Sequence, residues 1–282
     1  MDRDILSVIA DESRHYSKGQ KQIANYILEN YEKAAFMNAI TLGETVGVSE
    51  STVVRFASML GYDGYPAMRK ALQEMIRNKL TSVQRIEVTR EIMGTQDVLT
   101  SVLNSDTERL KETLNSIDKE AFDEVVNSII GAKNIYLLGL RASEVLSSFM
   151  GFYLNMIFDN VRVANDRYVN EIFEQIINIG EGDVLLAISF PRYSRRTVKA
   201  MRYAKRRGAK TIAITDDEIS PIADIADIRL FAKSDMVSFL DSLVAPLSLI
   251  NALLAALGNR RGGNLSETFE NLESIWTEYG VY

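Results

Sequence analysis

Short apolar runs alternate with helical patterns through the second half of the chain, and this alternation constrains the fold more than any other feature. The runs at 134–138, 183–188 and 211–215 are mostly apolar and are separated by helix-length segments. Shorter apolar runs at 161–163 and 228–230 fit the same pattern. Apolar strands connected by helices are typical of a parallel sheet that is covered on both faces. The sequence therefore predicts an α/β fold in this half, a doubly wound parallel sheet in an α/β/α sandwich.

Two of the predicted strands lead into a turn that carries an arginine. Arg141 follows the strand predicted at 134–138, and Arg192 follows the strand 183–188. A helical pattern begins directly after each turn. Parallel sheets bind their ligands beyond the carboxyl ends of the strands, and the start of a helix attracts anions. We therefore place a candidate anion-binding site at these two turns.

The first 79 residues predict a separate, all-α domain. Ser17 is suited to cap a helix over 18–30, in which apolar residues recur at helical spacing. A later helix over 41–46 ends at Gly47, which tolerates the left-handed conformation that closes helices. Ser49 is placed to cap the next helix, and Pro66 is placed to start the one after that. A helix, a glycine turn and a second capped helix form a helix-turn-helix unit, whose second helix enters the major groove of DNA.

The second helix of this unit presents Glu50, Ser51, Thr52 and Arg55 outward near its start. Serine and threonine hydroxyls can bond bases or phosphates, and arginine can pair bidentately with guanine. An ordinary helical hairpin with a solvated polar face would show the same pattern. The residues alone leave both interpretations open.

Composition limits the chemistry that the chain can perform. The 282 residues contain no cysteine and one histidine, so disulfides, thiolate metal sites and histidine-rich metal sites are ruled out, and we expect no cofactor. The start of the chain lacks the features of a signal peptide, and the apolar stretches fall short of the ~20 residues of a membrane span. We therefore expect a soluble, cytoplasmic protein with no membrane partner.

Charge is distributed unevenly between the two halves. The net charge is −6, but residues 1–80 hold ten Lys or Arg and ten Asp or Glu, so the remainder carries the whole excess. An acidic chain does not bind nucleic acid through its bulk field. Specific DNA binding would then depend on local contacts and on pairing of two heads.

Basic residues gather on the helix predicted at 194–207. Arg195 and Arg196 stand at its start, where the helix dipole disfavours cations, and they either help to attract an anion or lie exposed. Lys205-Arg206-Arg207 closes the helix, where cations are favourable. We interpret that second group as an ordinary stabilising helix end.

The chain resembles the RpiR-type bacterial transcriptional regulators. The head carries the resemblance in Gln22-Ile-Ala-Asn-Tyr-Ile-Leu-Glu-Asn30, in Gly47-Val-Ser-Glu-Ser-Thr-Val-Val-Arg-Phe56 and in Leu60-Gly-Tyr-Asp-Gly-Tyr65. It implies a helix-turn-helix domain over 1–79, a linker and connecting helix over 80–117, and an effector-binding domain similar to the sugar isomerase (SIS) domain over 118–282. By this resemblance the DNA-contacting residues are Ser49, Ser51, Thr52, Arg55 and, through phosphates, Lys18.

The resemblance also implies partners and a mode of action. These are a double-stranded DNA operator, a small anionic effector such as a phosphosugar, a sugar acid or another carboxylate, and a second copy in a homodimer or homotetramer. It favours a repressor, while the residues leave repressor and activator open.

The candidate effector site matches the SIS pattern in part. The family ends its first strand in a Gly-x-Gly-x-Ser turn and its third in Ser-x-Ser-Gly-x-Thr/Ser. The residues that match are Gly139, Ser143, Ser189 and Ser194. This chain departs from the pattern at Arg141 and Arg192, which stand for glycines, and at Pro191, which stands for serine. By the resemblance, all of these except Pro191 belong to the effector site.

The two arginines allow three interpretations. Their planar guanidinium groups can bind a carboxylate or phosphate directly, in place of the backbone amides that glycines expose. They can instead fill or seal a vestigial pocket. Alternatively, both pair with acidic residues at an interface.

Two rival functions remain beside a ligand-sensing regulator. A phosphosugar isomerase needs a general base, commonly glutamate or histidine. The only histidine, His15, lies in the predicted head, and no motif singles out a glutamate, so we expect no enzymatic activity. The other rival is a protein whose second domain serves oligomerisation alone.

Overall fold

The computed structural model divides the chain into two compact units. The first unit includes Met1–Val98, and the second begins at Leu99. His15 and residues 80–82 and 87–96 of the expected linker lie outside the described part of the chain. The residues described are 5–11, 16–77, 83–86, 97–165, 172–234, 240–261 and 263–281.

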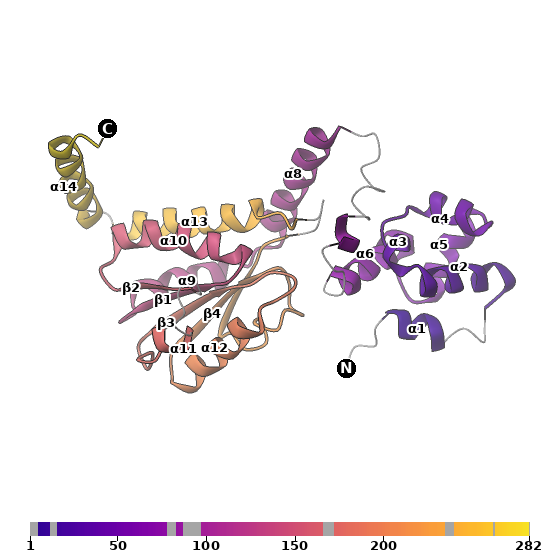
Figure 1. The fold of residues 1–282 in the computed structure, drawn as a ribbon, viewed down its shortest axis with the longest axis horizontal. Helices are drawn as coiled ribbons and strands as arrows, with labels where there is room; N and C mark the ends of the chain where they lie inside the picture. The colour runs from indigo at the N-terminus through magenta and orange to yellow at the C-terminus, as the bar shows by residue number, and fades with distance from the viewer. Residues whose placement is uncertain are drawn as a thin grey trace. The chain divides into compact units, whose positions relative to one another are not determined.

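The first unit is helical, as the sequence predicts (Figure 1). Its main helices are α1 (Ile5–Asp11), α2 (Lys18–Glu29), α3 (Tyr31–Ala34), α4 (Ala39–Val46), α5 (Glu50–Met59) and α6 (Gly64–Arg77). Ile23, Leu42 and Phe56 are fully buried and belong to one apolar cluster that joins α2, α4 and α5. The short α1 was not predicted.

The helix ends of this unit follow the predicted signals with two differences. Ser17 caps α2 in a reciprocal capping box with Gln20, and Gly47 ends α4 with a φ of 74°. Ser49 occupies the position before α5, but its side chain makes no capping bond. Its hydroxyl instead lies 2.9 Å from the hydroxyls of Ser51 and Thr52. The next helix begins at Gly64, two residues before Pro66. Proline is tolerated in the first turn of a helix, because the N–H that it lacks would have no partner within the helix there.

The second unit contains a five-stranded sheet in the order β2-β1-β3-β4-β5, with every neighbouring pair parallel. The strands are β1 (Ile135–Gly139), β2 (Val161–Ala164), β3 (Val184–Ile188), β4 (Lys210–Thr215) and β5 (Ile228–Phe231). The helices are α8 (Val98–Ser116), α9 (Lys119–Ile130), α10 (Ala142–Ile157), α11 (Ile172–Gln175), α12 (Arg195–Arg206), α13 (Val244–Arg261) and α14 (Gly263–Tyr279). The predicted doubly wound α/β fold is confirmed.

Helices cover both faces of this sheet (Figure 1). Alternate residues of β1 point to opposite sides, so that Leu137 packs in one apolar cluster and Leu138 in the other. The first cluster includes Met150 of α10 and Leu253 of α13, and the second includes Met201 of α12. Two-sided burial accounts for the nearly continuous apolar runs in the sequence.

Gly139 sets the distance between β1 and the helix that follows it. A Cβ atom at this position would collide with the backbone carbonyl group of Ser143 and would lie 2.7 Å from Oγ of Ser147. Only glycine therefore lets the start of α10 approach the end of β1 so closely. This contact holds the first turn at the carboxyl edge of the sheet.

Helix α8 forms two hydrogen bonds with the segment that precedes α13. The Oγ atom of Ser242 donates to Oδ1 of Asp106 at 2.6 Å, and the backbone N–H of Lys233 donates to Oγ1 of Thr113 at 3.0 Å. No helix in the described part of the chain is long and apolar enough to cross a membrane.

Replacing Gly139 with alanine should destabilise the second unit by about 1–3 kcal/mol, because the added methyl group overpacks the contact between β1 and α10. Urea unfolding followed by circular dichroism measures this change. Gly131→Ala is the matched control, since the nearest atom to its new Cβ is the carbonyl oxygen of Asn127 at 3.5 Å. Equal stability of the two variants would contradict the close-packing argument.

Candidate functional site

A small pocket lies at the carboxyl edge of the sheet, beyond β1 and β3. Five of the six residues that the sequence predicts for effector binding line it: Arg141, Ser143, Ser189, Arg192 and Ser194. The sixth, Gly139, lies just before the first turn and shapes it through the close contact with α10. The topology thus brings the two arginine-bearing turns together, as expected for parallel strands that are neighbours in a sheet.

Both arginines have a backbone conformation that L-residues rarely adopt. Arg141 has a φ of 60° and a ψ of −126°, and Arg192 has a φ of 61°. Among the described residues these are the only non-glycine positions with positive φ. Such conformations cost about 1–3 kcal/mol each for a residue with a side chain. Both strained positions line the same pocket, and strain of this kind clusters at functional sites.

Two of the three serines in the turns, Ser143 and Ser194, lie at the starts of helices. Ser143 belongs to the first turn of α10 and is buried, and Ser189 is buried at the end of β3. Ser194 caps α12 and accepts a hydrogen bond from the backbone N–H of Thr197. Two helix starts therefore meet at the pocket, and each contributes a partial positive charge.

The second turn is held in place by a buried polar network at the end of β4. The Oγ1 atom of Thr215 donates to the carbonyl oxygen of Ser189 at 2.7 Å. The hydroxyl of Tyr193 donates to the carboxylate of Asp216 at 2.8 Å. These bonds fix the backbone around Arg192 from the neighbouring strand.

Sequence reasoning missed one side of this pocket. Asp241 and Leu243 line it from the segment before α13, about 50 residues after the second turn. The signal available was the polar pair Asp241-Ser242 directly before a long apolar helix, which marks a helix start. The described lining therefore carries two arginines and one carboxylate.

The volume of the pocket is about 130 Å³. Binding sites for whole small molecules commonly measure about 300–1,000 Å³. A pocket of this size fits a phosphate or carboxylate group and its immediate neighbours. It therefore matches the charged end of a ligand better than a complete large metabolite.

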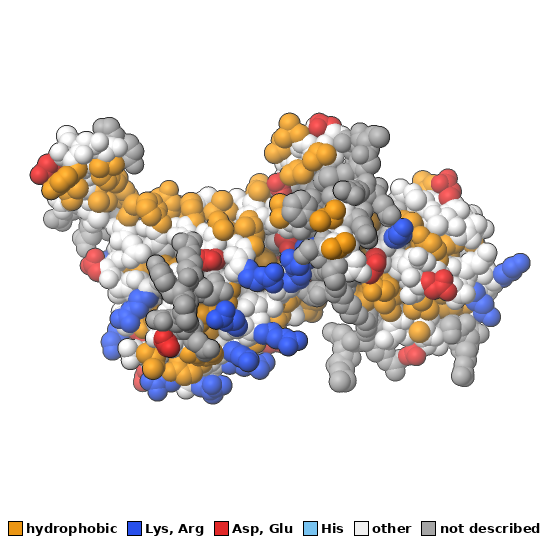
Figure 2. Space-filling view, viewed as in Figure 1, with side chains coloured by type: hydrophobic (Ala, Val, Ile, Leu, Met, Phe, Trp, Pro, Cys, Tyr) orange, Lys and Arg blue, Asp and Glu red, His pale blue; other side chains and the backbone are white. Residues whose placement is uncertain are grey.

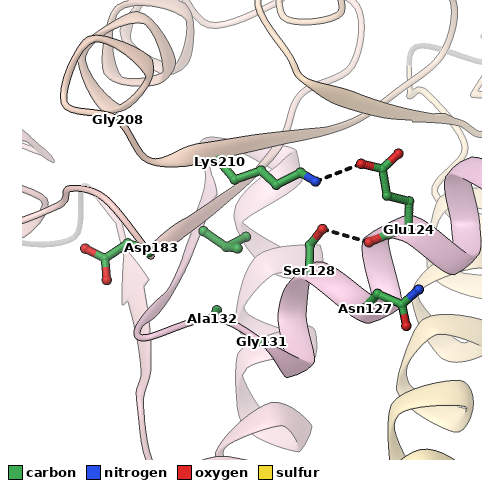
Figure 3. A pocket seen from close by; sticks show the side chains of 10 residues that line it. Glu124, Asn127, Ser128, Gly131, Ala132, Asp183, Gly208 and Lys210 are labelled. Carbon is green, nitrogen blue, oxygen red and sulfur yellow. Dashed lines mark hydrogen bonds and ion pairs between the residues drawn. The ribbon is translucent and has the colours of Figure 1, made fainter.

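A larger hollow of about 370 Å³ lies at the opposite, amino edge of the sheet (Figure 3). Its charged groups already have partners within the protein. Lys210 forms an ion pair with Glu124 at 2.7 Å, and Asp183 accepts hydrogen bonds from Asn134 and from the backbone N–H of Gly180. The hollow at the amino edge is therefore lined by charged groups that already bond within the protein.

In the first unit, a second candidate surface surrounds the start of α5. Ser49, Thr52 and Arg55 line a hollow of about 560 Å³ together with residues at the start of α2. Arg55 is exposed, and its Nε donates to the carbonyl oxygen of Ser51 at 3.2 Å. Lys18 is the exposed first residue of α2. The five residues predicted to contact DNA therefore belong to two neighbouring helix starts.

A glycine in α4 permits the tight turn of the helix-turn-helix unit. A Cβ on Gly43 would lie 2.8 Å from the carbonyl oxygen of Val48. The backbone N–H of Val48 in turn donates to the carbonyl oxygen of Gly43 at 2.8 Å. The glycine of this turn was predicted at Gly47, and the need for glycine at position 43 was missed.

Two protein families match the chain, in the same order as its two units. Residues 3–79 match the helix-turn-helix domain of the rpiR family, and residues 128–256 match the SIS domain. The chain belongs to the RpiR family of transcriptional regulators. A family member from Caldanaerobacter subterraneus subsp. tengcongensis, described as an uncharacterized HTH-type transcriptional regulator, is 23% identical over 279 residues and is matched over 96% of each chain.

Two solved structures resemble this RpiR-family regulator. The sugar isomerase domain of the RpiR transcription factor from Sphaerobacter thermophilus is 29% identical, has a TM-score of 0.59, and matches 64% of this chain and 99% of its own. The Vibrio vulnificus NanR protein complexed with ManNAc-6P is 20% identical, with a TM-score of 0.59 and 98% coverage of both chains. The match to NanR extends over both units, so the two folds follow one another in the same order in the two chains.

The strain at Arg141 and Arg192 predicts an inverted preference between glycine and alanine. At ordinary positions, alanine is more stable than glycine by about 0.4–1 kcal/mol. At 141 and at 192 we expect the glycine variant to be more stable than the alanine variant by about 1 kcal/mol or more, because glycine adopts positive φ without strain. Urea unfolding of the four single variants measures the difference.

The control for this comparison is Lys199, an exposed position in the interior of α12. There the free energy of unfolding of the alanine variant should exceed that of the glycine variant by about 1 kcal/mol. Alanine variants that are more stable at 141 and 192 as well would show that these backbones are not strained.

Proposed function

We propose that this RpiR-family regulator binds an operator through paired heads and senses a small anionic metabolite in the pocket at the carboxyl edge of the sheet. The observation that carries the proposal is the pair of arginines held at positive φ in one pocket. Glycine at either position would remove the backbone strain, so the presence of arginine at both supports a binding role for the guanidinium groups.

The pocket chemistry favours an anion. The described lining residues bear two guanidinium groups and one carboxylate, and two helix starts add partial positive charge. Guanidinium groups bind carboxylate and phosphate in a bidentate manner. A compact anionic head group fits the volume of about 130 Å³.

The class of ligand that we propose is a phosphosugar, a sugar acid or another carboxylate. The structural neighbour NanR is in complex with ManNAc-6P, which supports a phosphorylated sugar. The arginines that replace the family's glycines support a ligand bound through side chains, and this widens the class to carboxylates. Asp241 can accept a hydrogen bond from a ligand hydroxyl in the same pocket.

The proposed arrangement uses residues 1–79 to bind DNA, residues 80–117 to connect the parts, and residues 118–282 to bind the effector. We propose a cytoplasmic repressor that acts as a homodimer or homotetramer. Two heads would then reach half-sites about 34 Å apart or a multiple of that spacing.

The alternatives make different predictions. In the described residues the pocket presents no histidine, and the relatives are transcriptional regulators, so we propose no isomerase activity. A vestigial pocket would bind no effector. The affinity of the protein for its operator would then be the same in the presence of every metabolite.

The first test of this function is selection of bound fragments from genomic DNA by the full chain. We expect a recurring palindromic site. Arg55→Ala should reduce discrimination between that site and a site with a changed base by about 1–3 kcal/mol, because Arg55 is expected to read a base edge. Fluorescence anisotropy with both duplexes measures the difference.

The control variant for the head is Lys70→Ala, which removes an exposed cation from α6. An equal loss of affinity for every sequence in Arg55→Ala would show that Arg55 contacts phosphate. The absence of any selected site, with or without candidate anions, would overturn the proposal of an operator-binding protein.

The second test concerns the effector. Phosphosugars, sugar acids and dicarboxylates are titrated into the complex with the selected site. Replacing Arg141 and Arg192 together with alanine should abolish the response, since each charged hydrogen bond contributes about 1.5–3 kcal/mol, or roughly tenfold or more in affinity. Arg229→Ala, which alters an exposed arginine outside this pocket, should respond normally.

A double glycine variant at the same two positions separates side-chain from backbone binding. If the guanidinium groups bind the ligand, the glycine and alanine variants lose the response together. A response that survives in the glycine variant alone would assign binding to the turn amides. An unchanged response in both variants would remove this pocket from the proposal.

A further inference from the structure

Helix α12 presents the densest group of positive charge in the second unit. Six of its twelve residues are lysine or arginine, and none is acidic. The chain as a whole has a net charge of −6, so the positive charge of this helix is opposite in sign to that of the whole chain. Figure 2 shows blue side chains gathered over the region in which Figure 1 places α12.

Four of these cations form a single line along the helix: Arg195, Lys199, Arg202 and Arg206. Their spacing of four, three and four residues places them on one face, over about 16 Å at 1.5 Å per residue. All four are exposed, and none makes an ion pair with any residue in the described ranges. We refer to these four residues as the basic stripe.

Lys205 near the end of the helix and Arg207 directly after it are already engaged and are left out of the stripe. Lys205 forms an ion pair with Asp227 at 2.8 Å, and Nε of Arg207 donates to the carbonyl oxygen of Ile179. Burial acts to raise the pKa of Asp227, but hydrogen bonds from Lys205 and Thr211 outweigh it and leave this pKa below its ordinary value. That shift is what a genuine pair with Lys205 produces.

The stripe does not stabilise the fold. Like charges at helical i, i+4 spacing destabilise a helix by roughly 0.2–0.5 kcal/mol per pair. Arg195 also stands in the first turn, where the helix dipole disfavours a cation. A partner outside the folded chain would turn these unfavourable terms into favourable ones.

The chemistry of the stripe fits a polyanion rather than a protein surface. Protein interfaces centre on aromatic and other apolar side chains, and lysine is depleted there. The apolar residues beside the stripe, Val198 and Tyr203, are only partly exposed. The stripe is also separate from the effector pocket, because none of its four residues lines that pocket.

We propose that the basic stripe on α12 binds the phosphate backbone of duplex DNA that flanks the operator. Duplex DNA carries one charge per about 1.7 Å of its axis, so a line of cations about 16 Å long meets phosphates throughout. The first 80 residues have no net charge, and the stripe supplies the sequence-independent attraction that the head lacks. This inference rests on the proposed DNA-binding function.

The test compares two duplexes that contain the selected site. One is about 25 base pairs long, enough for two half-sites one turn apart, and the other extends it to about 60 base pairs. We expect the full chain to bind the longer duplex more tightly at low salt. The variant in which all four stripe residues become glutamine should lose that gain and keep its affinity for the shorter duplex.

Salt dependence gives an independent readout on the longer duplex. In the glutamine variant, the slope of log K against log salt should become shallower by about 0.9 for each phosphate that the protein no longer neutralises. For four phosphates, wild type should therefore lose about a hundredfold more affinity than the glutamine variant when the salt is raised from 50 to 200 mM. The slope on the shorter duplex should not change.

Two control variants isolate the stripe from net charge and from misfolding. Lys111, Lys119, Lys133 and Arg229 are exposed cations elsewhere in this unit, and their replacement by glutamine alters net charge equally. That variant should keep the gain from the flanking DNA. The second control variant preserves the charge of the stripe by combining Arg195→Lys, Arg202→Lys and Arg206→Lys. It should also keep the gain in affinity from the flanking DNA.

The inference is overturned if wild type gains nothing from the flanks, or if the stripe variant and the glutamine control behave alike. Either result would leave an acidic protein surface as the partner of α12. Failure of the operator model is distinguishable, because it would appear as an absence of sequence preference. In that case the stripe variant should still bind a random duplex of about 60 base pairs more weakly than wild type.

Discussion

The arrangement of the second unit depends on the close contact between the end of β1 and the start of α10. Gly139 permits that contact, since any Cβ would collide with the backbone of Ser143. Once the helix start is fixed there, the intervening turn has little freedom, and Arg141 adopts a φ of 60°. The strain at Arg141 is thus imposed by packing on one side and by the sheet on the other. A turn of this kind presents a guanidinium group from a rigid support, which reduces the entropy lost when an anion binds.

Much of the fold could be predicted because its determinants are local and repetitive. The apolar run before Gly139 and the capping residue Ser17 mark their elements without reference to the rest of the chain. The parallel order of β1 and β3 follows from the helices between them. The short helix α1 carries too few residues for a periodic pattern, and the capping bond expected of Ser49 is replaced by contacts among hydroxyl groups. Such competition between equivalent polar groups is settled only in three dimensions.

The candidate site was predictable on two sides and not on the third. The turns with Arg141 and Arg192 follow strands that are adjacent in the sheet, so their proximity can be inferred from the pattern. Asp241 reaches the same pocket from a segment about 50 residues later, and nothing in the local sequence specifies that path. The positive φ of both arginines was also beyond the sequence. At both positions arginine therefore adopts a backbone conformation that glycine tolerates without strain.

Asp241 also gives the pocket a route to the rest of the protein. Ser242, the next residue, donates a 2.6 Å hydrogen bond to the carboxylate of Asp106 on α8, which lies within the predicted linker and connecting helix over 80–117. A hydrogen bond to a charged group contributes about 1.5–3 kcal/mol, and allosteric coupling is typically about 1–3 kcal/mol. One bond of this type, present in one state and absent in the other, is therefore large enough to account for regulation. A ligand that contacts Asp241 would act on this bond through a single peptide unit, so long-range rearrangement of the sheet is not required to couple the pocket to α8.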